Sequence, residues 1–238
     1  MDAAPQASAP RRADVFAIGL LLLAALWLPP LPAAWRESLE NFGWFGREWA
    51  RGCRWDYALV PLLAVWALRL AWVDRPAWRD AGLDFRHFAA AARYLLWPTL
   101  AGAAALLLIG WSCDSIHITA RFWKRFLLNS AILQQAMLQL FFHRQLVPWT
   151  GAGRRTAWMV TIYFAILHAP NPGLMLGTLI GMYFWARCYQ KHPNLYALAI
   201  SQSFLSALLM HTMPKAMLPS VSVGLRFVEK AGWPLSGY

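Results

Sequence analysis

Long apolar runs alternate along the chain with shorter polar stretches that contain most of the arginines. Most of the runs have the roughly 17 to 25 residues that a helix needs to cross a bilayer. We therefore expect an all-α, polytopic integral membrane protein with about seven transmembrane helices. The expected spans cover about residues 15–35, 57–73, 88–111, 126–149, 156–168, 174–189 and 195–213.

The polar stretches and the prolines divide this pattern into segments. Residues 1–13 are rich in alanine and proline and predict a disordered tail. Residues 14–125 predict N-terminal membrane helices with their loops, residues 126–213 a core of helices, and residues 214–238 a C-terminal tail. The LPPLP sequence is expected to kink or end the first span, because proline removes a backbone donor and clashes with the preceding turn.

Composition agrees with a membrane protein. The 238 residues are 59% hydrophobic and only 14% charged, whereas soluble domains contain about 25% charged residues. The net charge of +11 does not indicate nucleic-acid binding, because the arginines lie between the spans and at their ends, where they meet lipid headgroups. No recognition module accompanies the charge. We expect membrane lipids as partners, no nucleic acid, and a location in the bacterial inner (plasma) membrane.

Polar side chains form a stripe inside the fourth span. Gln135, Gln139 and His143 are four residues apart and therefore lie on one face of a helix. A polar stripe within an apolar span is costly unless it faces protein or water, so it is a candidate site. The alternative is that these glutamines form hydrogen bonds between helices and line no cavity.

The next two spans carry two further patterns. Phe164 and His168 are also four residues apart, and His168 opens the turn sequence HAPNP. The span that follows begins with Gly173, Gly177 and Gly181, a doubled small-xxx-small pattern that allows two helix backbones to approach closely. We expect packing against a partner helix through this face.

These features together resemble the CAAX-protease and bacteriocin-processing superfamily of intramembrane proteases, also called the CPBP or Abi family. The resemblance covers roughly residues 75–213. The AGL sequence at residues 81–83 is similar to a family LGL segment, and Phe164 and His168 followed by PNP match the FxxxH motif and its usual neighbours. The resemblance implies a CAAX-protease-like helical core that cleaves a membrane-anchored or lipidated protein.

The two flanking family motifs are altered. The EExxxR motif falls on Gln139 and Leu140 if it is anchored on Arg144, or on the Gln134–Gln135 pair, and neither register contains a carboxylate. The last motif, a histidine with asparagine four residues later, falls on Gln202 and Ser206. The family glutamate is thought to activate water, whereas a glutamine can hold water but cannot take its proton. No Asp or Glu lies between positions 114 and 229 to replace it.

The matched positions provide the candidate site residues. A catalytic site would contain His168 as base, with Gln139, Arg144 and Gln202 positioning substrate and water. Substrate-binding positions are Gln135, His143, Phe164, Asn171 and Ser206.

Two hypotheses follow from the missing acid, and the sequence leaves both open. The first is an atypical endopeptidase centred on His168. The second is a pseudoprotease that retained a cavity and binds a hydrophobic peptide, a lipid or a partner helix as a chaperone or assembly factor. A structural membrane subunit is the third alternative.

Other chemistries have less support. A metal site of His143, His168 and His211 lacks a close ligand pair such as HxxxH, so no metal or other cofactor is expected. His211 is about half a turn out of phase with Gln202 and is a doubtful replacement for the family histidine. Serines near position 202 are typical of packing in membrane helices. The three cysteines are far apart, which argues against a zinc ribbon or a disulfide framework.

Overall fold

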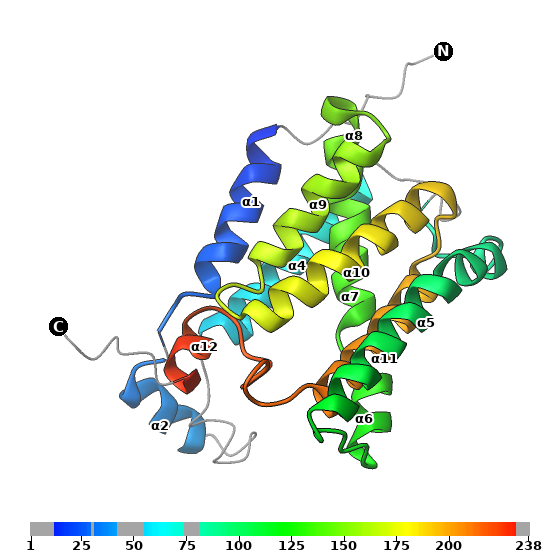
Figure 1. Ribbon diagram of the computed structural model, residues 1–238. Helices are drawn as coiled ribbons and strands as arrows, with labels where there is room; N and C mark the ends of the chain where they lie inside the picture. The colour runs from blue at the N-terminus through cyan, green and yellow to red at the C-terminus, as the bar shows by residue number, and fades with distance from the viewer. Residues whose placement is uncertain (1–11, 30, 42–54, 74–80, 232–238) are drawn as a thin grey trace.

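The computed structural model describes residues 12–29, 31–41, 55–73 and 81–231, and in these residues it is all-helical, without strands (Figure 1). The all-α prediction is therefore confirmed. Residues 1–11 of the predicted disordered tail lie outside the described residues. The helices are α1 (Arg12–Ala25), α2 (Ala33–Asn41), α4 (Trp55–Val73), α5 (Phe88–Ser112), α6 (Arg121–Leu127), α7 (Ala131–Ala136), η1 (Met137–His143), α8 (Arg144–Thr150), α9 (Arg154–Ile166), α10 (Pro172–Lys191), α11 (Leu195–Thr212) and α12 (Gly224–Ala231).

Two helices in the described part of the chain, α5 and α11, are long and apolar enough to cross a membrane. The seven expected spans are therefore not confirmed, although each of the seven apolar segments is helical. The exposed surface of α5 is apolar along most of its length, as a lipid-facing helix would be. Its exposed large side chains are Leu96, Trp97, Leu100, Leu107, Leu108 and Trp111.

The first helix is shorter than the expected span over residues 15–35. Helix α1 ends at Ala25, and the proline-containing segment after it leads into the separate helix α2. Proline cannot donate a backbone hydrogen bond, so the helical ladder stops at this segment. The sequence pattern had allowed either a kink or an end, and the structure shows the end.

The π-helix η1 lies at the centre of the helical core. It continues α7 and leads directly into α8, so residues 131–150 form one unbroken helix with a π-helical middle. All seven side chains of η1 are buried, and η1 contacts α4, α9 and α10. A helix buried on every side must be surrounded by other elements.

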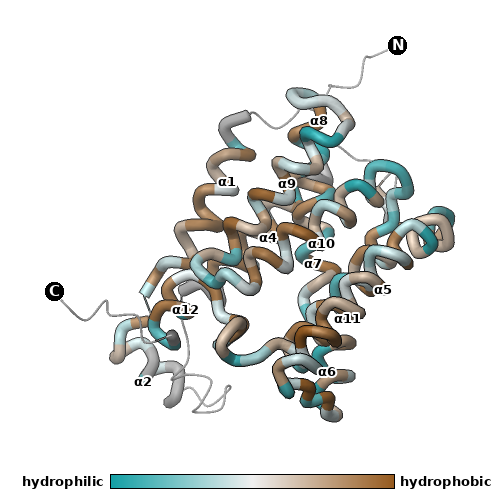
Figure 2. The backbone as a smooth tube through the Cα atoms, in the orientation of Figure 1, coloured by the Kyte–Doolittle hydropathy of each residue, from teal (hydrophilic) through white to brown (hydrophobic). Residues whose placement is uncertain are grey.

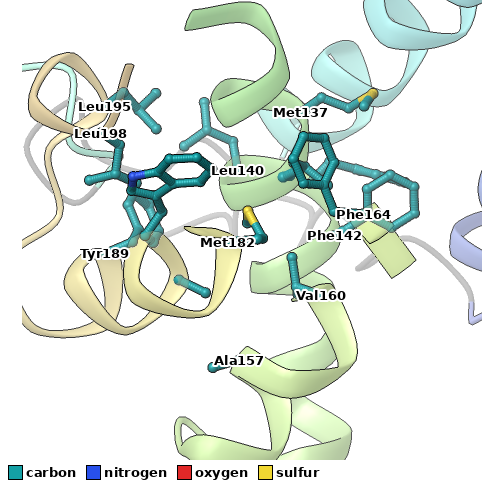
Figure 3. Close-up of a cluster of buried hydrophobic side chains, with 14 of the residues drawn as sticks. Met137, Leu140, Phe142, Ala157, Val160, Phe164, Met182, Tyr189, Leu195 and Leu198 are labelled. Atoms are coloured by element: carbon teal, nitrogen blue, oxygen red, sulfur yellow. The ribbon is translucent and has the colours of Figure 1, made fainter. Parts of the chain in front are cut away.

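One hydrophobic cluster fills the space around η1. Figure 3 shows buried side chains from η1, α9, α10 and α11 in this cluster, among them Phe142, Val160, Met182 and Leu198. Figure 2 shows the complementary pattern, in which hydrophilic residues gather towards the helix ends and the loops. Helix α9 packs beside α10, and α5 packs beside α11 (Figure 1).

The AGL segment holds the turn between α10 and α11 in place. The backbone N–H of Leu195 donates to the Gly82 carbonyl at 2.9 Å, and the Asn194 side chain donates to the Asp84 carbonyl at 2.7 Å. The hydroxyl of Tyr189 donates to the Ala81 carbonyl at 3.2 Å. This segment therefore fixes where α11, with Gln202, begins.

Candidate functional site

The predicted polar stripe is buried and internally hydrogen-bonded. Gln139 donates through Nε2 to Oε1 of Gln135 at 3.1 Å, and Nδ1 of His143 lies 2.7 Å from Oε1 of Gln139. The exposed fractions are 0% for both glutamines and 2% for His143. The stripe therefore faces protein and not lipid, as its cost in an apolar span requires.

The stripe continues onto α11 and then back to the start of α7. Gln135 donates through Nε2 to Oε1 of Gln202 at 2.7 Å, and Gln202 donates to Oε1 of Gln134 at 2.6 Å. Gln134 in turn donates to Oγ of Ser130 at 2.8 Å. The structure thus joins Gln202 with the stripe, as the motif positions predicted.

At its other end the stripe reaches α10. Nε2 of Gln190 lies 2.9 Å from Nε2 of His143 and also donates to the Gly153 carbonyl at 2.9 Å. Arg187 donates to Oε1 of Gln190 at 2.5 Å. We call the continuous chain of side chains the amide relay; its members are Ser130, Gln134, Gln202, Gln135, Gln139, His143 and Gln190.

The relay has one direction throughout, which fixes the state of His143. The Gly153 carbonyl can only accept, so Nε2 of Gln190 is a donor, and Nε2 of His143 must accept its hydrogen bond. Nδ1 of His143 then carries the proton and donates to Gln139. A protonated imidazole would have two donors and no acceptor, so this geometry selects the neutral ring.

The relay uses the polar groups that a catalytic site would need free. Both amide atoms of Gln135, Gln139 and Gln202 are hydrogen-bonded to other relay members. A water held by Gln139 would have to reach the remaining N–H or lone pair of a side chain that is 0% exposed. The arrangement is therefore suited to stabilising a polar layer between helices and is poorly suited to activating water.

His168 lies apart from the relay. Its Nδ1 donates to the Phe164 carbonyl at 2.8 Å, and the two rings meet edge to face with centroids 4.6 Å apart. Nε2 of this half-buried imidazole makes no hydrogen bond to the described residues. Phe164 itself is 2% exposed and belongs to the hydrophobic cluster, so in this structure it packs the core.

Asn171 has a structural environment. It is fully buried, and its side-chain oxygen caps α10 by accepting from the backbone N–H of Leu174 at 3.3 Å. Its Nδ2 donates to the carbonyls of Ser220 and Ser222 at 2.7 and 3.1 Å. These bonds tie the C-terminal segment to the turn after His168 and leave the amide group no free donor.

Arg144 differs from the residues of the relay. It is half-buried at the start of α8, and one of its guanidinium nitrogens, Nη1, is buried without a hydrogen-bond partner. A buried donor without an acceptor costs about 1–3 kcal/mol, and more when the group is charged. Arg144 is therefore the predicted site residue best able to bind an oxygen atom supplied from outside the chain.

The remaining candidates take separate positions. Ser206 lies on a cavity beside α6 that touches the relay only at its outer end, Ser130. His211 donates through Nδ1 to the Ala207 carbonyl at 2.8 Å. Across the described residues, no group of three histidine, cysteine or acidic side chains is arranged to hold a metal ion. Ser201 accepts from Nε1 of Trp185 at 3.0 Å and lies 2.7 Å from the Thr99 hydroxyl, which are packing contacts between helices.

The glycine face of α10 meets no second helix in the described structure. A Cβ at Gly173 would lie 2.7 Å from the Met217 carbonyl of the C-terminal segment, whereas one at Gly177 would have nothing within 4 Å. At Gly181 the nearest atoms belong to Trp185 of the same helix. Packing of this face against a partner helix therefore remains a prediction.

Sequence analysis missed two relay members, Ser130 at one end and Gln190 at the other, and Gln190 shows the reason best. It lies in a polar stretch at the end of α10, where a glutamine is unremarkable, and no spacing connects it with His143, which is 47 residues earlier. A pattern within one helix reveals only contacts along that helix. The contact could be found only once α10 was placed beside η1.

No protein-family model matches the chain, and neither a curated protein nor a solved structure is significantly similar to it. The resemblance to the CAAX-protease superfamily therefore stays a prediction.

Proposed function

We propose that the chain is an integral membrane protein with a CAAX-protease-like helical core that binds a membrane-anchored protein or partner helix without cleaving it. The amide relay carries this proposal. It occupies the positions of the family's glutamates and last histidine with amides that bond only to one another and to His143 and Ser130. None of these groups can accept a proton from water near neutral pH except His143, whose Nε2 is already bonded to Gln190.

Arg144 supplies the binding element of the proposal. Its unpartnered guanidinium nitrogen lies one residue after His143. A carboxylate or backbone carbonyl of a partner would satisfy this donor, and arginine binds carboxylates through paired hydrogen bonds. The exposed apolar surface of α10 around Gly177, with Leu176 and Ile180, offers a face for a partner helix in the membrane.

A hydrolase centred on His168 is the second candidate, and one observation favours it. The bond from Nδ1 to the Phe164 carbonyl orients the imidazole and leaves Nε2 able to accept a proton. In such an enzyme the base would be His168 itself, oriented by the Phe164 carbonyl and not by the relay.

One comparison in cells separates the two candidates. Membrane-protein C-termini are compared by mass spectrometry in cells that carry the intact protein, His168→Ala or Arg144→Gln, together with the proteins that co-purify with each variant. Arg154→Gln is the control, because Arg154 is an exposed arginine at the start of α9. We expect every membrane-protein C-terminus to be the same in cells that carry the intact protein and in cells that carry a variant. We expect only Arg144→Gln to lose a co-purifying partner.

The C-termini and the co-purifying proteins are compared only between cells that contain equal amounts of each variant. A terminus that is trimmed with the intact protein and untrimmed with His168→Ala would overturn the binding proposal and establish the hydrolase. Equal partner recovery with Arg144→Gln and with Arg154→Gln would remove Arg144 from the binding site.

A further inference from the structure

A cavity of about 700 Å³ lies between α6 and the C-terminal half of α11, separate from the relay's interior. Arg121, Lys124 and Arg125 line one side of it. Their spacing puts these three exposed cations on one face of α6, where like charges repel one another. In the part of the chain that the structure describes, none of the three forms an ion pair or a hydrogen bond through its side chain.

The inner end of the cavity contains hydrogen-bond donors. Oδ1 of Asn129 accepts from the backbone N–H of Ala131 at 2.8 Å and from the Ser203 hydroxyl at 2.9 Å, which fixes the orientation of the amide. Its Nδ2 is buried and has no partner, so it needs an acceptor. Ser130 accepts from Gln134 and keeps its own proton to donate, and Ser206 also lines the cavity.

The rest of the lining is apolar. Leu128, Ala207 and Met210 complete the wall, and no acidic side chain contributes to it. A ligand that fits must therefore present negatively charged oxygens to the cations and to Asn129, and an apolar part to the remaining wall.

Helix α6 is placed where membrane headgroups would lie. It follows the end of α5 and packs against α11 through Phe122, whose ring lies 5.6 Å from that of His211. Helices α5 and α11 are the two span-length helices, and both end at this side of the molecule (Figure 1). Exposed Trp123 and Leu127 flank the cations on α6, as in helices that lie in a membrane interface.

We propose that this cavity binds an anionic phospholipid, with the phosphate between the α6 cations and Asn129 and an acyl chain along Leu128 and Met210. A zwitterionic lipid would bring its own positive charge beside three cations. A free phosphate would gain nothing from the apolar wall. The site rests on the membrane location proposed above and is independent of whether the protein cleaves its partner.

Native mass spectrometry of the full-length protein in detergent tests the site. The protein is titrated with phosphatidylglycerol and with phosphatidylcholine of identical acyl chains. The triple variant Arg121→Gln/Lys124→Gln/Arg125→Gln is compared with the control Arg154→Gln/Arg155→Gln/Lys191→Gln, which removes three exposed cations at the opposite end of the bundle. Each basic residue near a phosphate contributes about fivefold in affinity, so we expect removal of all three in the α6 variant to weaken phosphatidylglycerol binding by roughly a hundredfold.

A second variant and a soluble competitor complete the test. Ser206→Trp places a large side chain in part of the cavity without changing charge, and it should weaken phosphatidylglycerol binding even if the triple variant does not fold. Glycerol 3-phosphate in millimolar excess should not displace the lipid. Equal binding of the two lipids, equal loss in the control variant, unchanged binding with Ser206→Trp, or displacement by glycerol 3-phosphate would each overturn the proposal. A protein released from membranes without detergent would instead contradict the membrane location.

Discussion

Gln139 shows how one amide decides between the functional interpretations. Its Nε2 donates to Gln135 and its Oε1 accepts from His143, so the side chain links two buried neighbours and has no exposed atom. A glutamate at this position would be an acceptor at both oxygens when ionised and would face the Oε1 of Gln135 with no proton between them. The direction of the relay therefore requires an amide at position 139.

Replacing Gln139 with leucine should destabilise the protein. The apolar side chain keeps much of the volume but leaves Oε1 of Gln135 and Nδ1 of His143 unpaired in the core. Each unsatisfied buried group costs about 1–3 kcal/mol. We expect a clearly lower melting temperature of the detergent-solubilised protein, measured by tryptophan fluorescence.

The matched control is Gln134→Leu, in the half-buried glutamine at the relay's outer end. There the partner left behind, Nε2 of Gln202, lies nearer the surface end of the relay, so a smaller loss is expected. A Gln139→Leu protein as stable as the wild type would show that the relay contributes little to stability.

At the scale of elements, the AGL segment acts through its backbone. Gly82 has a φ of +73°, which side-chain-bearing residues rarely adopt, and a Cβ there would lie 2.7 Å from the Pro193 carbonyl carbon. The segment can thus approach the turn between α10 and α11 only because position 82 has no side chain. This close approach fixes the position of the first turn of α11, and so it also fixes where Gln202 meets the stripe.

Gly82→Ala should therefore disturb α11 as well as its own turn. The positive φ costs about 1 kcal/mol, and the contact with Pro193 adds to that cost. We expect a lower melting temperature and faster amide hydrogen exchange in the first turns of α11. Gly153→Ala is the control, since a Cβ there meets nothing within 4 Å and φ is −140°. Equal behaviour of the two variants would argue against the proposed role of Gly82.

The long helices were predictable, whereas the contacts between them were not. The apolar runs located the long helices, because length and hydropathy can be seen within one segment, but they did not separate the short polar helix α2 from the first expected span. The spacing of Gln135, Gln139 and His143 predicted one stripe. The π-helical turn and the bond from Gln190 to His143 depend on packing between distant segments. Single-helix periodicity carries no information about such pairs.

At the scale of the whole molecule, the polar relay runs lengthwise through an apolar bundle. It begins near the start of α7 at Ser130 and reaches Gln190 at the end of α10, inside the shell formed by the hydrophobic cluster. Buried amides that are hydrogen-bonded to one another inside an apolar bundle are what a bilayer requires of a spanning bundle. The lysines and arginines divide almost equally between the two ends of the expected spans, so the sequence does not orient the bundle.

The unbroken helix over residues 131–150 provides a direct test of the membrane-spanning arrangement. A helix of this length covers about 30 Å, which is the thickness of the hydrocarbon core. Cys113 is exposed just after α5, before this helix, and Ala152 is exposed just after it. If the helix crosses the bilayer, the two positions lie on opposite sides of the membrane.

Labelling with a membrane-impermeant maleimide measures this directly. In a Cys53→Ser background, native Cys113 is compared with a Cys113→Ser/Ala152→Cys variant in sealed spheroplasts. We expect one position to react before permeabilisation and the other only afterwards, because the helix between them separates the two aqueous phases. Reaction of both positions from the same side would place residues 131–150 within one leaflet or outside the membrane. That outcome would leave α5 and α11 as the spans to be tested next, since each of these two helices has the length and hydropathy to cross a membrane.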